Sequence, residues 1–194
     1  MIARSRWWLV TILWVVLVSP QASAQGTAWE RHMAAGVKAY QQGRYADAEK
    51  SFQAAVKEAE GFEPQDPRLA TSLNNLAELY RYQGQYAKAE SLYKRALSIW
   101  EKALGPEHPD VAQSLNNLGV LYLIQGKYAE AEPLHKRALV IREKALGPNH
   151  PHVSQSLDNY ADLLRKMNRE SEAGKMEARA KAIRAKHARE NPAK

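Results

Sequence analysis

The 194-residue sequence contains no cysteine and only two phenylalanines. The lack of cysteine excludes a disulfide scaffold, a thiolate metal site and a cysteine nucleophile. The sequence also lacks a nucleophile elbow, a phosphate-cradling glycine loop and an HExxH helix. Its carboxylates recur at regular spacing on expected helix surfaces, where such groups are usually solvated. We therefore expect a protein that is not an enzyme and that binds no cofactor or metal.

A single long hydrophobic run is present, and it lies at the N-terminus. Arg4 and Arg6 precede it, the run covers Trp7–Val18, and the small residues Ala22-Ser23-Ala24 follow. This order is typical of a secretory signal peptide. The run has 12 residues, fewer than the about 20 that a helix needs to cross a bilayer. We predict cleavage after the second of these alanines, and an uncleaved anchor is the alternative.

Cleavage there divides the chain into a signal peptide at 1–24, a repeat region at 25–190 and a short tail at 191–194. We expect an exported protein, periplasmic in a bacterium or secreted, with no stable membrane span once the signal peptide is removed. The net charge of the whole chain is only +7. This excess is mild, so nucleic acid is not an expected partner.

The region that follows repeats itself. Residues 70–111 align without a gap on residues 112–153, and 29 of the 42 positions are identical. A fixed period of this length indicates a solenoid, in which each unit buries its faces only against its neighbours. Weaker copies flank the pair, which gives units at about 29–62, 70–104, 112–146 and 154–188. The last unit has lost the glycine and tyrosine of the others, so it is either a true repeat or a capping helix pair.

Each unit predicts two helices. In the second unit, apolar residues at i, i+3, i+4 and i+7 form one stripe of the first helix: Leu73, Leu76, Ala77 and Tyr80. Gly84 follows in a tight break, where a residue without Cβ can take positive φ. The second helix carries small residues at Ala89 and Ala96 that allow two helices to approach closely. Prolines such as Pro109 suit the first turn of the next helix.

The recurring residues resemble the tetratricopeptide repeat. The set of small residue, tyrosine, glycine, alanine, aromatic and alanine occurs as Gly36-Tyr40-Gly43-Ala48-Phe52-Ala55, Ala77-Tyr80-Gly84-Ala89-Tyr93-Ala96 and Gly119-Tyr122-Gly126-Ala131-His135-Ala138. The 42-residue period, the SLNNLA segment and the LGP-x-HP linker are similar to the kinesin light chain subfamily of these repeats. The resemblance implies an all-α, right-handed superhelical solenoid of antiparallel helix pairs. It also implies a module that binds another protein or a peptide segment.

Paired asparagines stand in the first helix of each of the two best copies. At 100° per residue they fall on the arc opposite the face that packs on the second helix. Four of the five differences between these two first helices fall on the same arc. A constant amide can hold any peptide backbone, while variable neighbours recognise side chains. The resemblance implies this role for Asn75, Asn117 and Asn159.

We therefore predict a peptide-binding site on the concave face. Its candidate residues share that arc in the last three units: Asn74, Asn75, Glu78, Arg81, Asn116, Asn117, Asp158, Asn159, Asp162 and Arg165. The alternative is structural, because adjacent asparagines could instead bridge neighbouring helices and set the superhelical twist.

The linker histidines and the basic face of the C-terminal helix can each be explained either by a structural role or by a binding function. His108 and His150 stand in the linkers, where they could cap the helix that starts at the next proline or could help to hold a metal. The C-terminal helix has a basic face, with Lys175, Arg179, Lys181, Arg184, Lys186 and Arg189. It could be a solvating cap of the solenoid, or it could contact anionic lipid or an acidic partner.

Two functions follow from the sequence. The first is an exported module that holds an extended segment of another protein in its concave groove. The second is an assembly scaffold that acts through self-association or through its convex face in an envelope complex. The sequence names neither the partner nor the oligomeric state.

The first testable prediction concerns the N-terminus. If a signal peptidase cleaves after Ala24, the intact mass of the exported protein will correspond to a chain that starts at Gln25. A full-length mass in the membrane fraction would show an uncleaved anchor instead.

Overall fold

The structure is a computed structural model that describes residues 27–191. Within that range the chain forms eight α-helices and no strand. They are α1 (Ala28–Gln41), α2 (Tyr45–Ala59), α3 (Pro67–Tyr82), α4 (Tyr86–Leu104), α5 (Pro109–Ile124), α6 (Tyr128–Leu146), α7 (Pro151–Lys166) and α8 (Glu170–Glu190).

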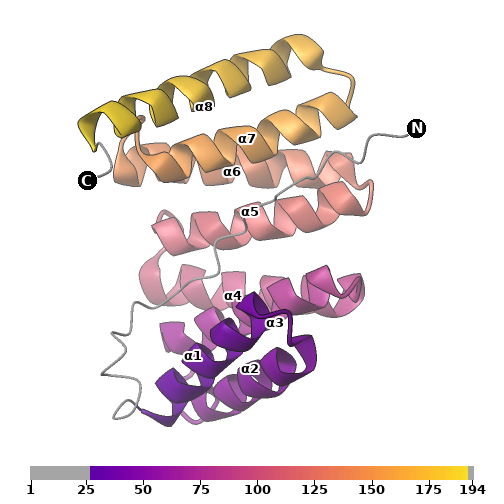
Figure 1. The fold of residues 1–194 in the computed structure, drawn as a ribbon, viewed down its shortest axis with the longest axis vertical. Helices are drawn as coiled ribbons and strands as arrows, with labels where there is room; N and C mark the ends of the chain where they lie inside the picture. The colour runs from indigo at the N-terminus through magenta and orange to yellow at the C-terminus, as the bar shows by residue number, and fades with distance from the viewer. Residues whose placement is uncertain (1–26, 192–194) are drawn as a thin grey trace.

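The helices stack as consecutive antiparallel pairs, from α1–α2 at one end to α7–α8 at the other (Figure 1). Each helix packs mainly against the other member of its pair, and the second helix of a pair packs against the first helix of the next. First helices also contact each other directly, as α3 does α5 and α5 does α7. The predicted all-α right-handed solenoid is confirmed.

Small residues and one ring control how closely the two helices of a pair approach. Six alanines, two on the second helix of each of the first three pairs, are completely buried: Ala48, Ala55, Ala89, Ala96, Ala131 and Ala138. Between them lie the buried rings of Phe52, Tyr93 and His135. Gly36 and Gly119 face the first and third ring so closely that a Cβ would lie 2.5 Å from Phe52 and 2.8 Å from His135. The ring therefore occupies the space that a side chain would need.

The turns and helix starts follow the sequence pattern. Gly84 takes a φ of +76° in the break between α3 and α4, and Asn168 takes 59° in the last unit, where the glycine is missing. The side chain of Asp66 accepts a hydrogen bond from the backbone of Arg68 at 2.8 Å. The contact made by Asp66 satisfies a backbone N–H group that the start of a helix leaves free.

The linker histidines are caps. Nδ1 of His108 accepts from the backbone of Asp110 at 3.2 Å, and Nδ1 of His150 accepts from that of His152 at 3.2 Å. No group of three or more metal-ligating side chains occurs within residues 27–191. The capping role is thus confirmed for both residues.

One assignment in the first unit was wrong. Tyr40 was matched with Tyr80, yet it lies three residues before its turn glycine, whereas Tyr80 lies four before Gly84. Ala39 takes the place equivalent to Tyr80. Tyr40 instead packs edge to face on Tyr82, with ring centroids 6.0 Å apart.

The fourth unit is a complete helix pair. α7 and α8 pack along each other, and α8 is the longest helix of the described region at 21 residues. Val153, Leu157, Ala180 and Ile183 form a second small core under it. In the part of the chain from 27 to 191, no helix combines the length and hydropathy required of a membrane span. The predicted signal peptide lies outside the described residues.

Candidate functional site

A groove of about 540 Å³ opens between α5 and α7, at the end where each helix turns into its partner. Its lining comes from three helices: Val120, Leu123 and Ile124 of α5, Tyr128 of α6, and Asn159, Asp162, Arg165 and Lys166 of α7. The α5 side is apolar and the α7 side is polar. This is the mixed lining found in sites that bury an apolar group and orient it with a few polar contacts.

The apolar side leaves part of its aliphatic surface exposed. Ile124 is 40 % exposed, and Leu123 is half-buried beside it. Exposed aliphatic side chains are common singly, but here they are grouped in a concavity.

The polar side carries charges of both signs. Burial raises the pKa of Asp162 above its usual value, and the nearby Arg165 partly opposes that shift. Arg165 forms an ion pair with Glu177 of α8, so its guanidinium is held at the rim. Asn159 is half-buried, and its amide makes no hydrogen bond to residues 27–191.

The second unit differs sharply at the equivalent positions. Glu78 and Arg81 replace Val120 and Leu123, and they form an ion pair that is almost completely buried, with residue exposures of 3 % and 9 %. The hydroxyl of Tyr93 donates to Oε2 of Glu78 at 2.7 Å. The charges of this pair are therefore satisfied inside the protein. Removing one partner of such a pair typically costs about 3–5 kcal/mol.

Three of the four paired asparagines bridge helices. Asn117 donates from Nδ2 to Oδ1 of Asn74 at 3.1 Å, which joins α5 to α3. Oδ1 of the same Asn117 accepts from Nε2 of Gln113 at 2.9 Å. Asn116 donates to Oγ of Ser156 at 2.7 Å, which joins α5 to α7. These amides thus connect the first helices of successive units, the alternative role that the sequence left open.

These hydrogen bonds between the first helices of successive units form an amide ladder, and it continues through a buried arginine. Arg142 of α6 is 2 % exposed and takes the place of Trp100 in the previous unit. It donates to the backbone oxygen of His152 at 3.0 Å, to Ser156 at 2.9 Å and to Oε1 of Gln113. No carboxylate of the described chain forms an ion pair with it, and burial lowers its pKa to about 10. The guanidinium is therefore a buried positive charge held only by neutral acceptors.

Asn75 is the exception among the four. It is 1 % exposed, and neither atom of its amide has a hydrogen-bond partner among residues 27–191. Asn117 finds its acceptor at Asn74, in the unit before it. A shift of 41 residues aligns the first unit with the second, and it places Met33 at the position where Asn75 would need the equivalent acceptor. Thr71 stands at the position of Gln113, but its hydroxyl donates to the backbone of Pro67 at 3.0 Å.

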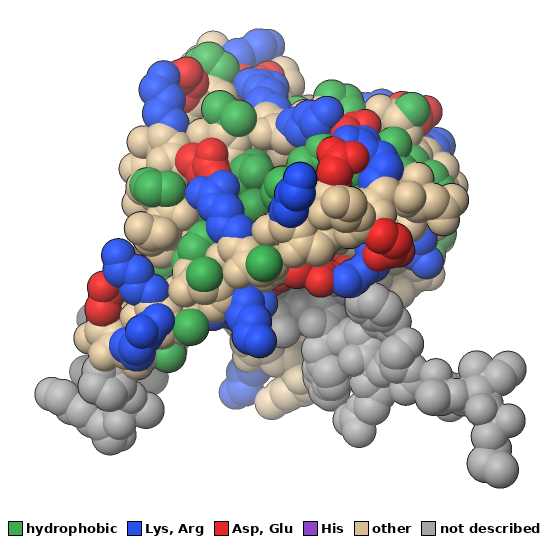
Figure 2. Space-filling view, turned by 90° about the horizontal axis from the view of Figure 1, so that it is seen from above, with side chains coloured by type: hydrophobic (Ala, Val, Ile, Leu, Met, Phe, Trp, Pro, Cys, Tyr) green, Lys and Arg blue, Asp and Glu red, His purple; other side chains and the backbone are tan. Residues whose placement is uncertain are grey.

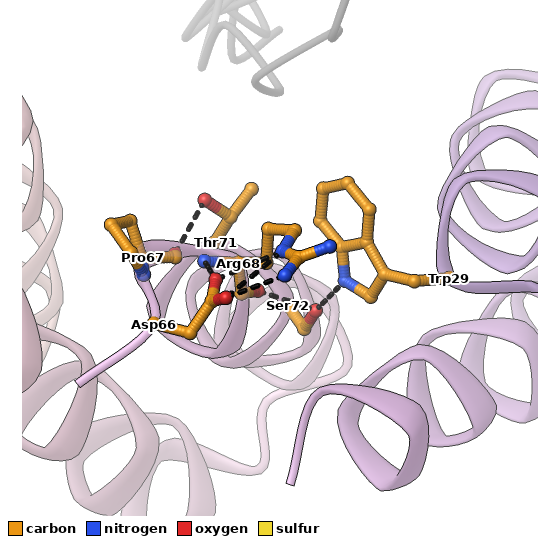
Figure 3. A network of polar contacts seen from close by, with 6 residues as sticks. All are labelled: Trp29, Asp66, Pro67, Arg68, Thr71 and Ser72. Carbon is orange, nitrogen blue, oxygen red and sulfur yellow. Dashed lines mark hydrogen bonds and ion pairs between the residues drawn. The ribbon is translucent and has the colours of Figure 1, made fainter. Parts of the chain in front are cut away.

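Figure 3 shows how α1 and α3 are joined instead. Nε1 of Trp29 donates to Oγ of Ser72 at 2.7 Å, and Ser72 donates to the backbone of Arg68 at 2.8 Å. Thr71 lies beside this contact with its hydroxyl turned toward Pro67. The amide ladder ends at α3 because the first unit supplies a tryptophan contact in its place.

The predicted site residues therefore fall into three groups. Asn159, Asp162 and Arg165 line the groove together. Asn74, Asn75, Asn116, Asn117, Glu78 and Arg81 are buried between helices. Asp158 pairs with Arg184 of α8.

Sequence reasoning did not assign the apolar lining to the site. Three of the positions at which the second and third units differ are Val120, Leu123 and Ile124, whereas Tyr128 stands at a position that is the same in both. A search for apolar residues on the predicted concave arc would have found the first three.

This geometry can now be compared with known proteins. The tetratricopeptide repeat model matches residues 31–102, 68–139 and 110–186. These matches cover most of the chain, so the protein belongs to the tetratricopeptide repeat family. A search of curated proteins finds no match.

The chain is also similar to several solved structures. The chain is similar to BtubC (BKLC) from P. vanneervenii, at 28 % identity and a TM-score of 0.75, over 86 % of this chain and 66 % of that one. It is also similar to a putative kinesin light chain with TPR-like repeats from Podosopora anserina, at 27 % identity and a TM-score of 0.64, over 88 % and 79 %. Aspartyl phosphate phosphatase F from Bacillus subtilis, at 19 % identity and a TM-score of 0.73 over 87 % and 45 %, shares the fold. The structural neighbours thus include kinesin-light-chain-like repeat proteins.

The amide ladder yields a prediction that separates two asparagines. Asn117→Ala leaves Asn74 and Gln113 without their partner, which should cost about 1–3 kcal/mol for each buried group. Asn75→Ala removes no hydrogen bond and improves helix propensity, so stability should stay unchanged or rise. Urea denaturation of both variants measures this. Equal destabilisation would show that Asn75 has a partner of its own.

The buried histidine predicts a pH dependence. Burial lowers the pKa of His135 to about 4, from an ordinary value of 6.5. Between these values the unfolded chain binds the extra proton, so stability falls as pH drops from about 6.5 toward 4, by about 1.4 kcal/mol per pH unit. His135→Phe copies the first unit, where Phe52 faces Gly36. Its unfolding free energy should lose this part of the pH slope.

The difference in pH slope between the wild type and the variant reports on His135 alone. Burial also lowers the pKa values of His150 and His152, but both residues are present in the two proteins. The variant should be less stable at pH 7, since Asn116 loses the Nδ1 contact at 3.1 Å. Parallel slopes for the two proteins would contradict the assignment.

Proposed function

We propose that this protein is an exported, non-enzymatic tetratricopeptide repeat module that holds an extended segment of another protein in the groove between α5 and α7. Repeats of this family generally serve protein–protein interaction rather than catalysis. The observation that carries the proposal is the groove itself, with apolar side chains on one side and polar side chains on the other, among them the amide of Asn159, which is unpaired within residues 27–191.

The two sides would divide the work of recognition. An apolar side chain of the bound segment packs against Leu123 and Ile124, which removes exposed aliphatic surface from water. The amide of Asn159 can donate to and accept from the backbone of the segment at once. At the rim, Asp162 would favour a positively charged group of the segment, and Arg165 would favour a negatively charged one.

The location of the groove also supports sequence selectivity. The same positions in the second unit are taken by the Glu78–Arg81 ion pair, so a segment running along the solenoid would meet a different surface in each unit. Recognition of side chains would thus be local to the third and fourth units. Export is proposed from the order of charges, apolar run and small residues at the N-terminus.

Peptides selected from a random display library against the chain provide the test. Ile124→Glu places a charge in the apolar side of the groove and should weaken binding of the selected peptides by about tenfold or more, or about 1.4 kcal/mol. Val140→Glu is the matched control, because Val140 is an exposed aliphatic residue of α6, at 61 %, that does not line the groove. Fluorescence anisotropy gives both affinities. Equal effects of the two substitutions would rule out this groove as the site.

A further inference from the structure

The charge of α8 is divided between its two halves. From Glu170 to Glu177 it carries three acidic residues and one lysine, whereas from Ala178 to Glu190 it carries five lysines and arginines and one glutamate. Figure 2 looks onto this end of the solenoid and shows Lys and Arg side chains spread over it. The proposed groove function does not use this end of the molecule.

Four of the cations lie on one face of the helix. Lys175, Arg179, Lys186 and Arg189 follow the spacing i, i+4, i+11 and i+14, with Ala182 at i+7 between them. All five are exposed. At 1.5 Å per residue the row is about 21 Å long. We call these four cations the basic stripe.

The stripe borders a concave surface. A groove of about 510 Å³ lies between the C-terminal half of α8 and the linker from α6 to α7. Ala182 and Ile183 contribute apolar surface to it, and three of the four stripe cations line it together with Asn149 and Glu190. This groove shares no residue with the one between α5 and α7.

Two of the four stripe cations pair with carboxylates within residues 27–191, and two do not. Arg179 pairs with Glu143 of α6, and Lys186 is 3.9 Å from Glu190. Lys175 and Arg189 form no ion pair with any residue from 27 to 191. The surface therefore has cations available for an external anion.

A buried cation of α6 lies close to the linker that borders this groove. The buried Arg142 has no carboxylate partner in the described chain, and it donates to the backbone of His152 in the first turn of α7, two residues after His150 of the linker. Burial, followed by the charges of Arg142 and His187, lowers the pKa of His150. Burial is the larger cause, and the nearby positive charges act in the same direction.

We infer that the basic stripe and its groove form a second binding surface, which takes an acidic segment of a partner protein. A run of about 14 residues with Asp or Glu at intervals of three and four would place its carboxylates opposite the stripe if helical. The concave shape favours a peptide over a flat lipid surface. The exposed residues between the cations on this face are the alanines Ala178, Ala182 and Ala185. Ile183, the large apolar residue of the groove, is only 3 % exposed, so no large apolar side chain is available to enter a bilayer.

The test uses one charge-matched pair of variants. Lys175→Gln with Lys186→Gln removes two stripe charges. Lys57→Gln with Lys181→Gln removes two exposed lysines that lie outside the stripe and its groove. All four residues are exposed, so both variants keep their cores. The probe is a fluorescein-labelled, alanine-based peptide of about 15 residues with glutamates spaced alternately three and four apart. Its affinity is measured by anisotropy at low and at physiological salt.

The wild-type chain should bind this peptide, and more weakly at the higher salt. The stripe variant should bind about fivefold more weakly, and the control within about twofold of the wild type. Equal weakening in both variants would overturn the proposal, because net charge alone would then explain binding. So would the absence of wild-type binding. Binding to phosphatidylglycerol vesicles but not to the peptide would identify a lipid surface instead.

Discussion

Each helix pair of this protein can bury its apolar faces only against the pair before and the pair after it, and the rest of the structure depends on that constraint. A completely buried ring between two completely buried alanines fixes the spacing within the first three pairs. Between pairs, first helices lie so close that their polar residues must bond across the interface. Asn117 reaches Asn74 in this way, and Asn116 reaches Ser156. Buried amides without such partners would cost more than they contribute.

The contacts between units and the lining of the groove therefore use different parts of α5. The part of α5 up to Asn117 is bonded to its neighbours through Gln113, Asn116 and Asn117. Nearer the C-terminal end, α5 lines the groove with Val120, Leu123 and Ile124, and these positions differ between the second and third units. In the second unit the corresponding positions hold the buried Glu78–Arg81 pair, and in the third they hold Val120 and Leu123. One backbone thus presents an internal ion pair in one unit and an open apolar surface in the next.

Much of the fold could be predicted from residue spacing. The period, the turn glycines, the prolines in the first turn and the alanine–ring–alanine pattern are local features, and each has a local physical cause. The candidate site was harder to predict, because a helical arc does not show how near the next helix lies. Asn74 and Asn116 share that arc with Asn159, yet only Asn159 lines the groove. The basic face of α8 was visible in the sequence, whereas the groove beside it forms only when α8 packs over the linker.

The sequence by itself determined the class of the protein, because helix pairs repeated at a fixed period bury their alanine and ring faces against their neighbours and so form a solenoid. It also determined the caps, since Asp66 and His150 act on backbone groups two residues away. Only the tertiary structure decided which amides are structural and which are open. The partner of Asn117 lies 43 residues away, and Asn75 lacks the equivalent partner because the first unit has Met33 there. Whether a polar side chain has a hydrogen-bond partner depends on which residue the neighbouring unit places beside it. The sequence of its own unit does not show that.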